Sequence, residues 1–170
     1  MTETQDKREI ANWKKPAGWA AVGFTAGVLL TVIVGWSIMP GMMIVTEESR
    51  LNVDDTVALI EKAVVEQGWV VSGTTDMNRS LAKHGVEFGP RVKVVKLCKP
   101  EYAQSVLKTD PDVACLMPCS IAVWESDDGR VYVSKMNTGL MGKMFGGNIA
   151  KVMGGQVAED EHAMLAGILR

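Results

Sequence analysis

Thiol chemistry is the most distinctive chemistry in this sequence, and three cysteines supply it: Cys98, Cys115 and Cys119. Two thiols form a disulfide in an oxidising compartment when their Cα atoms come within about 7 Å. On one extended strand, Cys115 and Cys119 would be roughly 13 Å apart. Cys98, which ends the preceding apolar segment, is therefore the better partner for either, unless Pro118 breaks the strand. The alternative is that all three are small buried hydrophobes.

Binding of a soft metal ion is a second use for the same sulfur atoms. Met117 and Met136 lie near the cysteines in the chain, and thiolates combined with thioethers select Cu(I) over harder ions. The candidate metal or redox residues are therefore Cys98, Cys115, Cys119, Met117 and Met136. The competing interpretation is that the methionines fill the core, as methionine at helical spacing usually does.

Other kinds of site are not indicated. The two histidines, His84 and His162, fall in different predicted elements, which argues against a zinc site. A C-x-x-C-H haem attachment sequence is missing, and no cofactor is required by the sequence. No G-x-S-x-G nucleophile elbow occurs, and Asp127-Asp128 falls in a predicted turn, where Asp is favoured for backbone reasons. We expect no catalytic residues, and a non-catalytic protein rather than an enzyme.

Composition excludes one class of partner. Apolar residues make up 47% of the chain and the net charge is −2, which is typical of a folded protein. A protein that binds the phosphate backbone carries a clustered basic excess. We therefore expect no nucleic-acid partner.

A membrane segment precedes the part of the chain that carries the cysteines. Residues 16–46 contain no charged side chain, and within them residues 17–39 are long enough for a helix that crosses the bilayer. Trp19 and Trp36 lie near its two ends, where amphipathic rings favour the headgroup boundary. Pro40-Gly41 is expected to end the helix. The alternative, a cleaved signal peptide, has a shorter apolar region of about 7–15 residues.

Flanking charge predicts the orientation of this helix. Lys and Arg side chains precede it, and none follows until Arg50; positive residues stay on the cytoplasmic side. We therefore expect a cytoplasmic tail at residues 1–16, a transmembrane helix at 17–39 and an exported domain at 40–170. The expected location is the inner (cytoplasmic) membrane, with the domain in the periplasm. The basic residues of the tail are Lys7, Arg8, Lys14 and Lys15.

One face of the predicted transmembrane helix carries small side chains. Gly23, Gly27, Thr31 and Gly35 recur every four residues, which places them on one side of a helix. Small residues let a second helix approach closely in lipid. Besides the lipid bilayer, the sequence therefore predicts a helical partner, in a homo-oligomer or in an integral-membrane complex.

Hydrophobic periodicity predicts the elements that position the cysteines. Residues 53–67, bounded by Asn52 as N-cap and Gly68, have the apolar stripe of a helix. Alternation predicts strands at 42–51, 69–77, 91–98, 113–124 and 130–137, the last two joined by a turn at Asp128-Gly129. Further helices are expected at 80–85, from Pro100 onward, at 140–153 and from 159 to the end. In the helix that begins at Pro100, the side chains of Ala103, Val106 and Leu107 are expected to face the core. Gly154-Gly155 is expected to end the helix at 140–153. This order predicts an α+β fold, a two-layer domain with helices on a mostly antiparallel sheet.

Several separate blocks of the predicted domain resemble a known family. They are Gly68-Trp69, Leu97-Cys98-Lys99-Pro100 with Tyr102-Ala103, Met117-Pro118-Cys119, Val131-Tyr132-Val133-Ser134 with Met136-Asn137, and Lys143-Met144-Phe145-Gly146-Gly147. From about residue 45 to 168 the chain resembles the domain-of-unknown-function 302 family. The resemblance implies a small α+β domain, often paired into dimers, and no established catalytic residues.

Two functions remain open from the sequence. The first is a membrane-anchored, non-catalytic periplasmic module that self-assembles or serves as an accessory subunit of a membrane complex. The alternative is a periplasmic protein for thiol redox chemistry, sulfur handling or binding of a soft metal such as copper, or of haem, through Cys98 and Cys119.

Overall fold

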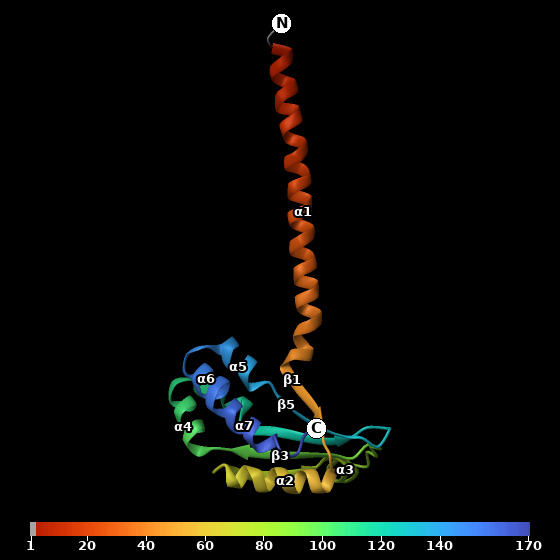
Figure 1. Ribbon diagram of the computed structural model, residues 1–170, viewed down its shortest axis with the longest axis vertical. Helices are drawn as coiled ribbons and strands as arrows, with labels where there is room; N and C mark the ends of the chain where they lie inside the picture. The colour runs from red at the N-terminus through yellow and green to blue at the C-terminus, as the bar shows by residue number, and fades with distance from the viewer. Residues whose placement is uncertain (1–2) are drawn as a thin grey trace. The chain divides into compact units, whose positions relative to one another are not determined.

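The computed structural model describes the backbone of residues 3–170 and the side chains of residues 20, 22–39 and 41–170. Contacts divide the chain into two compact units, Met1–Pro40 and Gly41–Arg170. The side chains of the predicted cytoplasmic tail, with its four basic residues, and of Trp19 lie outside the described residues. Figure 1 gives the order of the elements.

Helix α1 (Glu3–Met43) accounts for most of the first unit. Its segment Val22–Met39 has a mean hydropathy of 2.0 and none of it is buried. Length and composition make it able to cross a membrane, two properties that a signal sequence shares. The prediction that Pro40-Gly41 ends the helix is wrong, because α1 continues to Met43. One proline removes a single helical hydrogen bond, and the helix instead ends where Ile44 begins to pair with the sheet.

Five strands form one sheet, with every neighbouring pair antiparallel. The strands are β1 (Ile44–Glu48), β2 (Val70–Asp76), β3 (Val92–Cys98), β4 (Cys119–Glu125) and β5 (Val131–Met136), in the spatial order β1-β5-β4-β3-β2. Gly129, with φ of 78°, makes the predicted tight turn between β4 and β5. At the edge, β1 is extended by a bridge between Ser49 and Leu169 near the end of the chain.

Helix α2 (Val53–Glu66) follows the prediction closely. The Asn52 side chain caps it by accepting a hydrogen bond from the Asp55 N–H at 3.0 Å. Its apolar stripe is buried against the sheet, and the stripe consists of Val53, Val57, Ile60 and Val64. Trp69, directly after the helix, is buried in the same core.

The core lies between the helices and one face of the sheet. The remaining helices are α3 (Met77–Ala82), α4 (Pro100–Thr109), α5 (Thr138–Phe145), α6 (Gly147–Lys151) and α7 (Ala158–Leu165). Alternate residues of the central strands, such as Val95, Ile121 and Val133, share one buried cluster with side chains from α2, α4, α6 and α7. This confirms the α+β fold. Leu107, expected to face inward, is instead 36% exposed.

The predicted strand at 113–124 is wrong in its first half. Pro111–Leu116 forms a 3₁₀-helix, and the strand begins only at Cys119. Pro118 has no N–H to donate to a neighbouring strand, so a ladder starts after it rather than across it. The alternating apolar residues upstream of Pro118 therefore do not share the face of β4.

The predicted helix break at Gly154-Gly155 is also wrong. Val152–Val157 forms a π-helical segment that runs directly into α7, whereas the chain turns at Gly146 and Gly147, with φ of 74° and 53°. Positive φ is accessible to glycine without steric cost. Gly154 has a different task, because a Cβ atom on Gly142 would lie only 2.6 Å from the Gly154 nitrogen. The absence of a side chain on Gly142 lets α5 pack directly on the backbone of the π-helical segment.

We predict that Gly142→Ala lowers the free energy of unfolding by about 2 kcal/mol, because backbone atoms must move to admit the methyl group. Gly155→Ala is the matched control, since a Cβ there meets no atom within 4 Å; its effect should stay within about 1 kcal/mol. Urea denaturation of the full chain in mild detergent, followed by tryptophan fluorescence, measures both. Equal stabilities of the two variants would contradict the close packing.

Candidate functional site

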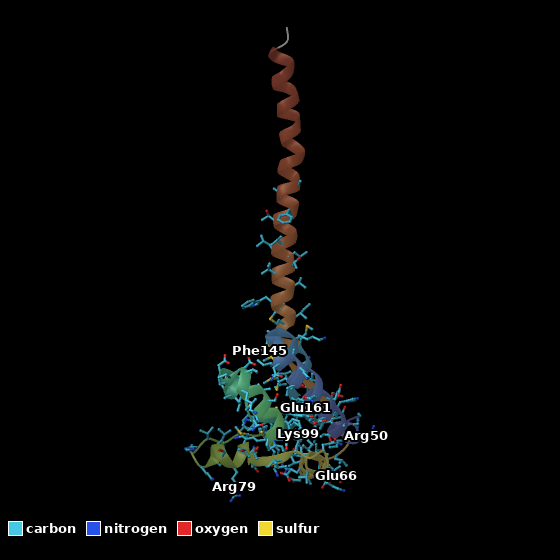
Figure 2. The ribbon with its side chains drawn as sticks, turned by 90° about the vertical axis from the view of Figure 1, so that its left-hand side faces the viewer. Arg50, Glu66, Arg79, Lys99, Phe145 and Glu161 are labelled. Carbon is cyan, nitrogen blue, oxygen red and sulfur yellow. The ribbon has the colours of Figure 1, made fainter. Side chains whose placement is uncertain are left out.

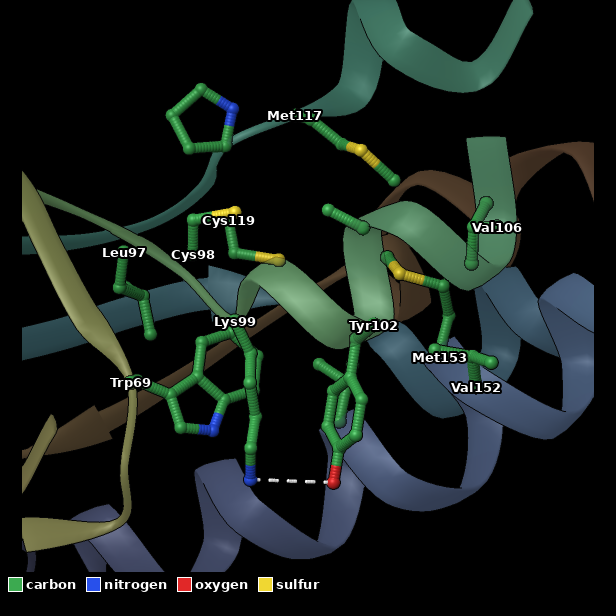
Figure 3. Close-up of a pocket in the computed structure, with 13 residues that line it drawn as sticks. Trp69, Leu97, Cys98, Lys99, Tyr102, Val106, Met117, Cys119, Val152 and Met153 are labelled. Carbon is green, nitrogen blue, oxygen red and sulfur yellow. Dashed lines mark hydrogen bonds between the residues drawn. The ribbon is translucent and has the colours of Figure 1, made fainter. Parts of the chain in front are cut away.

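A small cavity of about 20 Å³ lies between the ends of β3 and β4, helix α4 and the π-helical segment. Four of its lining residues contain sulfur: Cys98, Cys119, Met117 and Met153. Figure 3 shows these side chains entering from separate segments of the chain, with Trp69, Lys99 and Tyr102 on one side. A volume of about 10–15 Å³ is what one water molecule needs. The cavity therefore has room for one ion or one water, and not for an organic substrate.

Strand register brings two of the three cysteines together. Leu97 pairs with Cys119 at the start of β4, and Cys98, the next residue, ends β3. Both are free thiols that line the cavity. Cys115 is different, because it lies on the 3₁₀-helix and is exposed.

The predicted methionine ligands are divided between two cavities. Met117 lines the cavity with the cysteines, whereas Met136 lines a second one of about 10 Å³. Met117 and Met153 line both, so the two cavities adjoin, and Met141 also lines the second. Among the described residues, no three His, Cys, Asp or Glu side chains come together as a metal site.

Burial controls the chemistry of Cys119. It raises the pKa of the thiol to about 12, with smaller contributions from Glu161 and from Cys98. The thiol is therefore protonated at neutral pH. A protonated thiol is a poor nucleophile, so Cys119 is unsuited to thiol–disulfide exchange in this state.

An ion pair closes one side of the cavity. Lys99 Nζ donates to Asp160 Oδ2 at 2.9 Å, and the Trp69 indole N–H donates to the same oxygen at 2.9 Å. Lys99 Nζ also lies 4.6 Å from the centre of the Tyr102 ring. The hydrogen bond to Asp160 raises the pKa of Lys99. Burial opposes ionisation of Asp160, but the hydrogen bonds from Lys99 and Trp69 outweigh it and lower its pKa.

A second ion pair lies deeper in the domain. Glu161 is 2% exposed and accepts hydrogen bonds from Lys135 Nζ at 2.8 Å and from the Thr138 hydroxyl at 3.1 Å. Figure 2 shows Glu161 and Lys99 within the domain. The sequence predicts that a last helix begins at the acidic residues 159–161. They instead follow the π-helical segment without interruption, and Asp160 and Glu161 each neutralise a lysine from the sheet side.

Asp127-Asp128 behaves as a turn, as its sequence context predicts. Asp128 accepts from the Arg130 backbone N–H at 3.3 Å and from Arg130 Nε at 2.7 Å. These bonds hold the pKa of Asp128 well below its usual range. The carboxylate of Asp128 therefore stabilises the hairpin.

The two histidines, His84 and His162, line neither the sulfur-lined cavity nor the adjoining one.

Sequence reasoning missed Trp69, Lys99, Asp160 and Met153 as parts of one site. A signal was present, because three of the blocks that carry the family resemblance converge here: Gly68-Trp69, the segment from Leu97 to Ala103, and Met117-Pro118-Cys119. Asp160 belongs to none of these blocks. Its place follows only from the continuity of the π-helical segment with α7.

Comparison with known proteins gives a family and a fold. A family model described as "Domain of unknown function DUF302" matches residues 45–169. An uncharacterized protein of Aquifex aeolicus (strain VF5) is 37% identical over 57 residues, which are 34% of this chain and 40% of that relative. The match thus spans about two-fifths of the relative's length.

A solved structure shares the architecture. The crystal structure of an uncharacterized conserved protein DUF302 from Bacillus stearothermophilus superposes with a TM-score of 0.65 at 18% identity. The match covers 74% of this chain and 97% of that one. At this identity the similarity concerns the fold alone.

We predict that Asp160→Asn lowers the free energy of unfolding by about 2 kcal/mol at pH 7, because a hydrogen bond between charged groups is lost. The folded-state pKa of Asp160 is lowered, so its contribution is present above the unfolded value of 3.8 and disappears as pH falls through the lowered value. The difference between parent and variant should therefore shrink towards zero in acid. Denaturation at several pH values measures it, with the exposed Glu159→Gln as control. A difference that does not depend on pH would contradict the role of the charge.

Proposed function

The chain belongs to the DUF302 family, the domain of unknown function that matches residues 45–169, and from this premise we propose that it is a membrane-anchored, non-catalytic module. In this proposal α1 anchors the chain in the cytoplasmic membrane, with the N-terminus in the cytoplasm and the domain in the periplasm. The module assembles with itself or serves as an accessory subunit of an integral-membrane complex. The observation that carries the proposal is the apolar segment Val22–Met39, none of which is buried.

The apolar side chains of this segment are exposed. Phe24 is 75% exposed and Trp36 is 81% exposed, and Figure 2 shows side chains projecting from α1 on several sides. A helix that is apolar all round belongs in a protein core or in lipid. Because no described part of the chain covers it, lipid is the environment that this surface favours.

Polar groups within the segment support the same environment. The Thr31 hydroxyl donates to the Gly27 carbonyl at 2.9 Å, and the Ser37 hydroxyl donates to the Ile33 carbonyl at 2.8 Å. In hydrocarbon every polar group needs an internal partner. These two hydroxyls have such partners inside their own helix.

The geometry of the domain supports a binding or assembly role over catalysis. Its two most buried ion pairs, Lys99 with Asp160 and Lys135 with Glu161, neutralise charges of the domain itself. The sulfur-lined cavity, whose wall includes Lys99 and the two cysteines, is too small for an organic substrate. The raised pKa of Cys119 disfavours thiol redox chemistry. Of the alternatives to an accessory role, binding of a single soft ion is the one that the sulfur-lined cavity supports.

The face of α1 that carries small residues supports assembly. A Cβ atom on Gly23, Gly27 or Gly35 would meet no atom within 4 Å. A second helix could therefore approach the backbone at these positions and at Thr31. The family resemblance, which implies frequent dimers, agrees with a homo-oligomer.

We predict that the full chain stays with the membrane after an alkaline wash and that external protease degrades the domain in spheroplasts. Replacing Val28 and Ile33 with arginine should release the chain from the membrane, since each arginine at the centre of a span costs roughly 3 kcal/mol. Val65→Arg, on an exposed position of α2, is the matched control. Release of the parent domain into the periplasm would show that α1 is a cleaved signal sequence. Protection of the domain from external protease would show that the domain faces the cytoplasm, opposite to the proposed orientation.

We also predict that Gly23→Ile with Gly27→Ile leaves the segment in the membrane but weakens its self-association roughly tenfold, because β-branched side chains block close approach. A reporter of helix association in membranes measures the effect. Leu29→Ala with Ile33→Ala, away from the small residues, serves as the control and should associate like the parent. If the isoleucine variant also associates like the parent, the glycine face is not an interface.

A further inference from the structure

The cavity in the DUF302 domain is lined by an unusual concentration of sulfur. The thiols of Cys98 and Cys119 and the thioethers of Met117 and Met153 all belong to its wall. They come from the end of β3, the start of β4, the residue before Pro118 and the π-helical segment. Figure 3 shows the four side chains around one space. Three separate stretches of the chain, at residues 98, 117–119 and 153, thus bring four soft donors to one cavity.

From this convergence we propose that the cavity is a binding site for one Cu(I) ion. Cys98 and Cys119 are the thiolate ligands, each thiol releasing its proton to solvent as the ion binds, and Met117 and Met153 are the thioether ligands. Soft sulfur donors select Cu(I) from the metals available to a protein. The proposal goes beyond the accessory function and does not depend on the membrane anchor.

The size of the cavity selects a single ion. Its volume of about 20 Å³ exceeds the 10–15 Å³ that one water needs, and a haem group is far larger. Ordinary core packing leaves few voids that could hold a water. Methionine that serves only as filler would close such a space, because its flexible side chain adapts to gaps.

The donor set argues against harder metals. Zinc sites in proteins use cysteine, histidine and carboxylate ligands, but neither histidine lines this cavity. Lys99, which lines the cavity, is bonded to Asp160 at 2.9 Å, and Glu161, whose charge acts on Cys119, is bonded to Lys135 at 2.8 Å. The remaining wall is mainly apolar, from residues such as Leu97, Val106 and Val157. Sulfur is therefore the donor that the wall offers to an ion.

The adjoining cavity provides an internal comparison. Met136 and Met141 line it together with Met117 and Met153, but no cysteine does. Thioethers alone bind Cu(I) without the charge of a thiolate. Met136 and Met141 are therefore matched methionines that lie near the proposed site and outside it.

The test is a competition for Cu(I) between the full chain, reduced and held in mild detergent without oxygen, and the coloured chelator bathocuproine disulfonate. We expect the parent to withdraw one Cu(I) per chain, and X-ray absorption to show only sulfur neighbours around the copper. Cys98→Ser with Cys119→Ser should lower the affinity at least about 100-fold, since even outer partners of a metal site contribute 10–100-fold. Met117→Leu with Met153→Leu, which conserves volume, should lower it about tenfold.

Two control variants complete the experiment. Cys115→Ser, on the exposed 3₁₀-helix, and Met136→Leu with Met141→Leu should change the affinity by less than about twofold. Circular dichroism establishes that each variant is folded, and Cys98→Ser alone, at a half-buried strand end, replaces the double cysteine variant if that one unfolds. The proposal is overturned if the parent does not compete with the chelator, if the cysteine variant binds as tightly as the parent, if Cys115→Ser abolishes binding, or if equimolar Zn(II) displaces the copper.

Discussion

The carboxylate of Asp160 joins three distant parts of the domain. One oxygen accepts hydrogen bonds from Lys99, directly after β3, and from Trp69, directly before β2. The carboxylate itself belongs to α7. This single acceptor therefore links the C-terminal helix to the strand ends, and the π-helical segment runs directly into that helix. The wall of the sulfur-lined cavity depends on that position, because Met153 comes from this segment.

Local patterns were sufficient for the elements whose residues interact with near neighbours in sequence. Asn52 caps α2, the apolar stripe from Val53 to Val64 is buried, and Gly129 turns the hairpin, all as the sequence predicts. The same holds for the α+β class, which follows from the order of strands and helices. The sequence offers Cys98 as a partner for either Cys115 or Cys119; in the structure Cys98 and Cys119 line one cavity, whereas Cys115 is exposed.

Sequence patterns gave wrong predictions where two kinds of secondary structure share one periodicity. They also failed where the contacts of a residue are made with residues far away in the sequence. The alternating residues from Val113 to Met117 look like a strand, but a 3₁₀-helix precedes Pro118, and alternation over so short a segment does not distinguish the two. Gly154 looks like a helix breaker, yet it lies within the π-helical segment, and Gly142 of α5 packs closely against its backbone. Likewise, Glu161 looks like a helix-start charge until Lys135 is known to lie beside it.

The pairing of β1 with β5 has a consequence for the order of folding. The Thr46 and Ser134 hydroxyls, 2.8 Å apart, belong to residues 88 positions apart in sequence, and Leu169, near the end of the chain, bridges to Ser49. The first strand to leave the ribosome must therefore wait for almost the whole domain before its hydrogen bonds can form. Pairings of such long sequence separation slow folding, and they leave a strand edge open to wrong partners in the meantime. Synthesis of this domain thus has a vulnerable interval, which ends only when its last residues arrive.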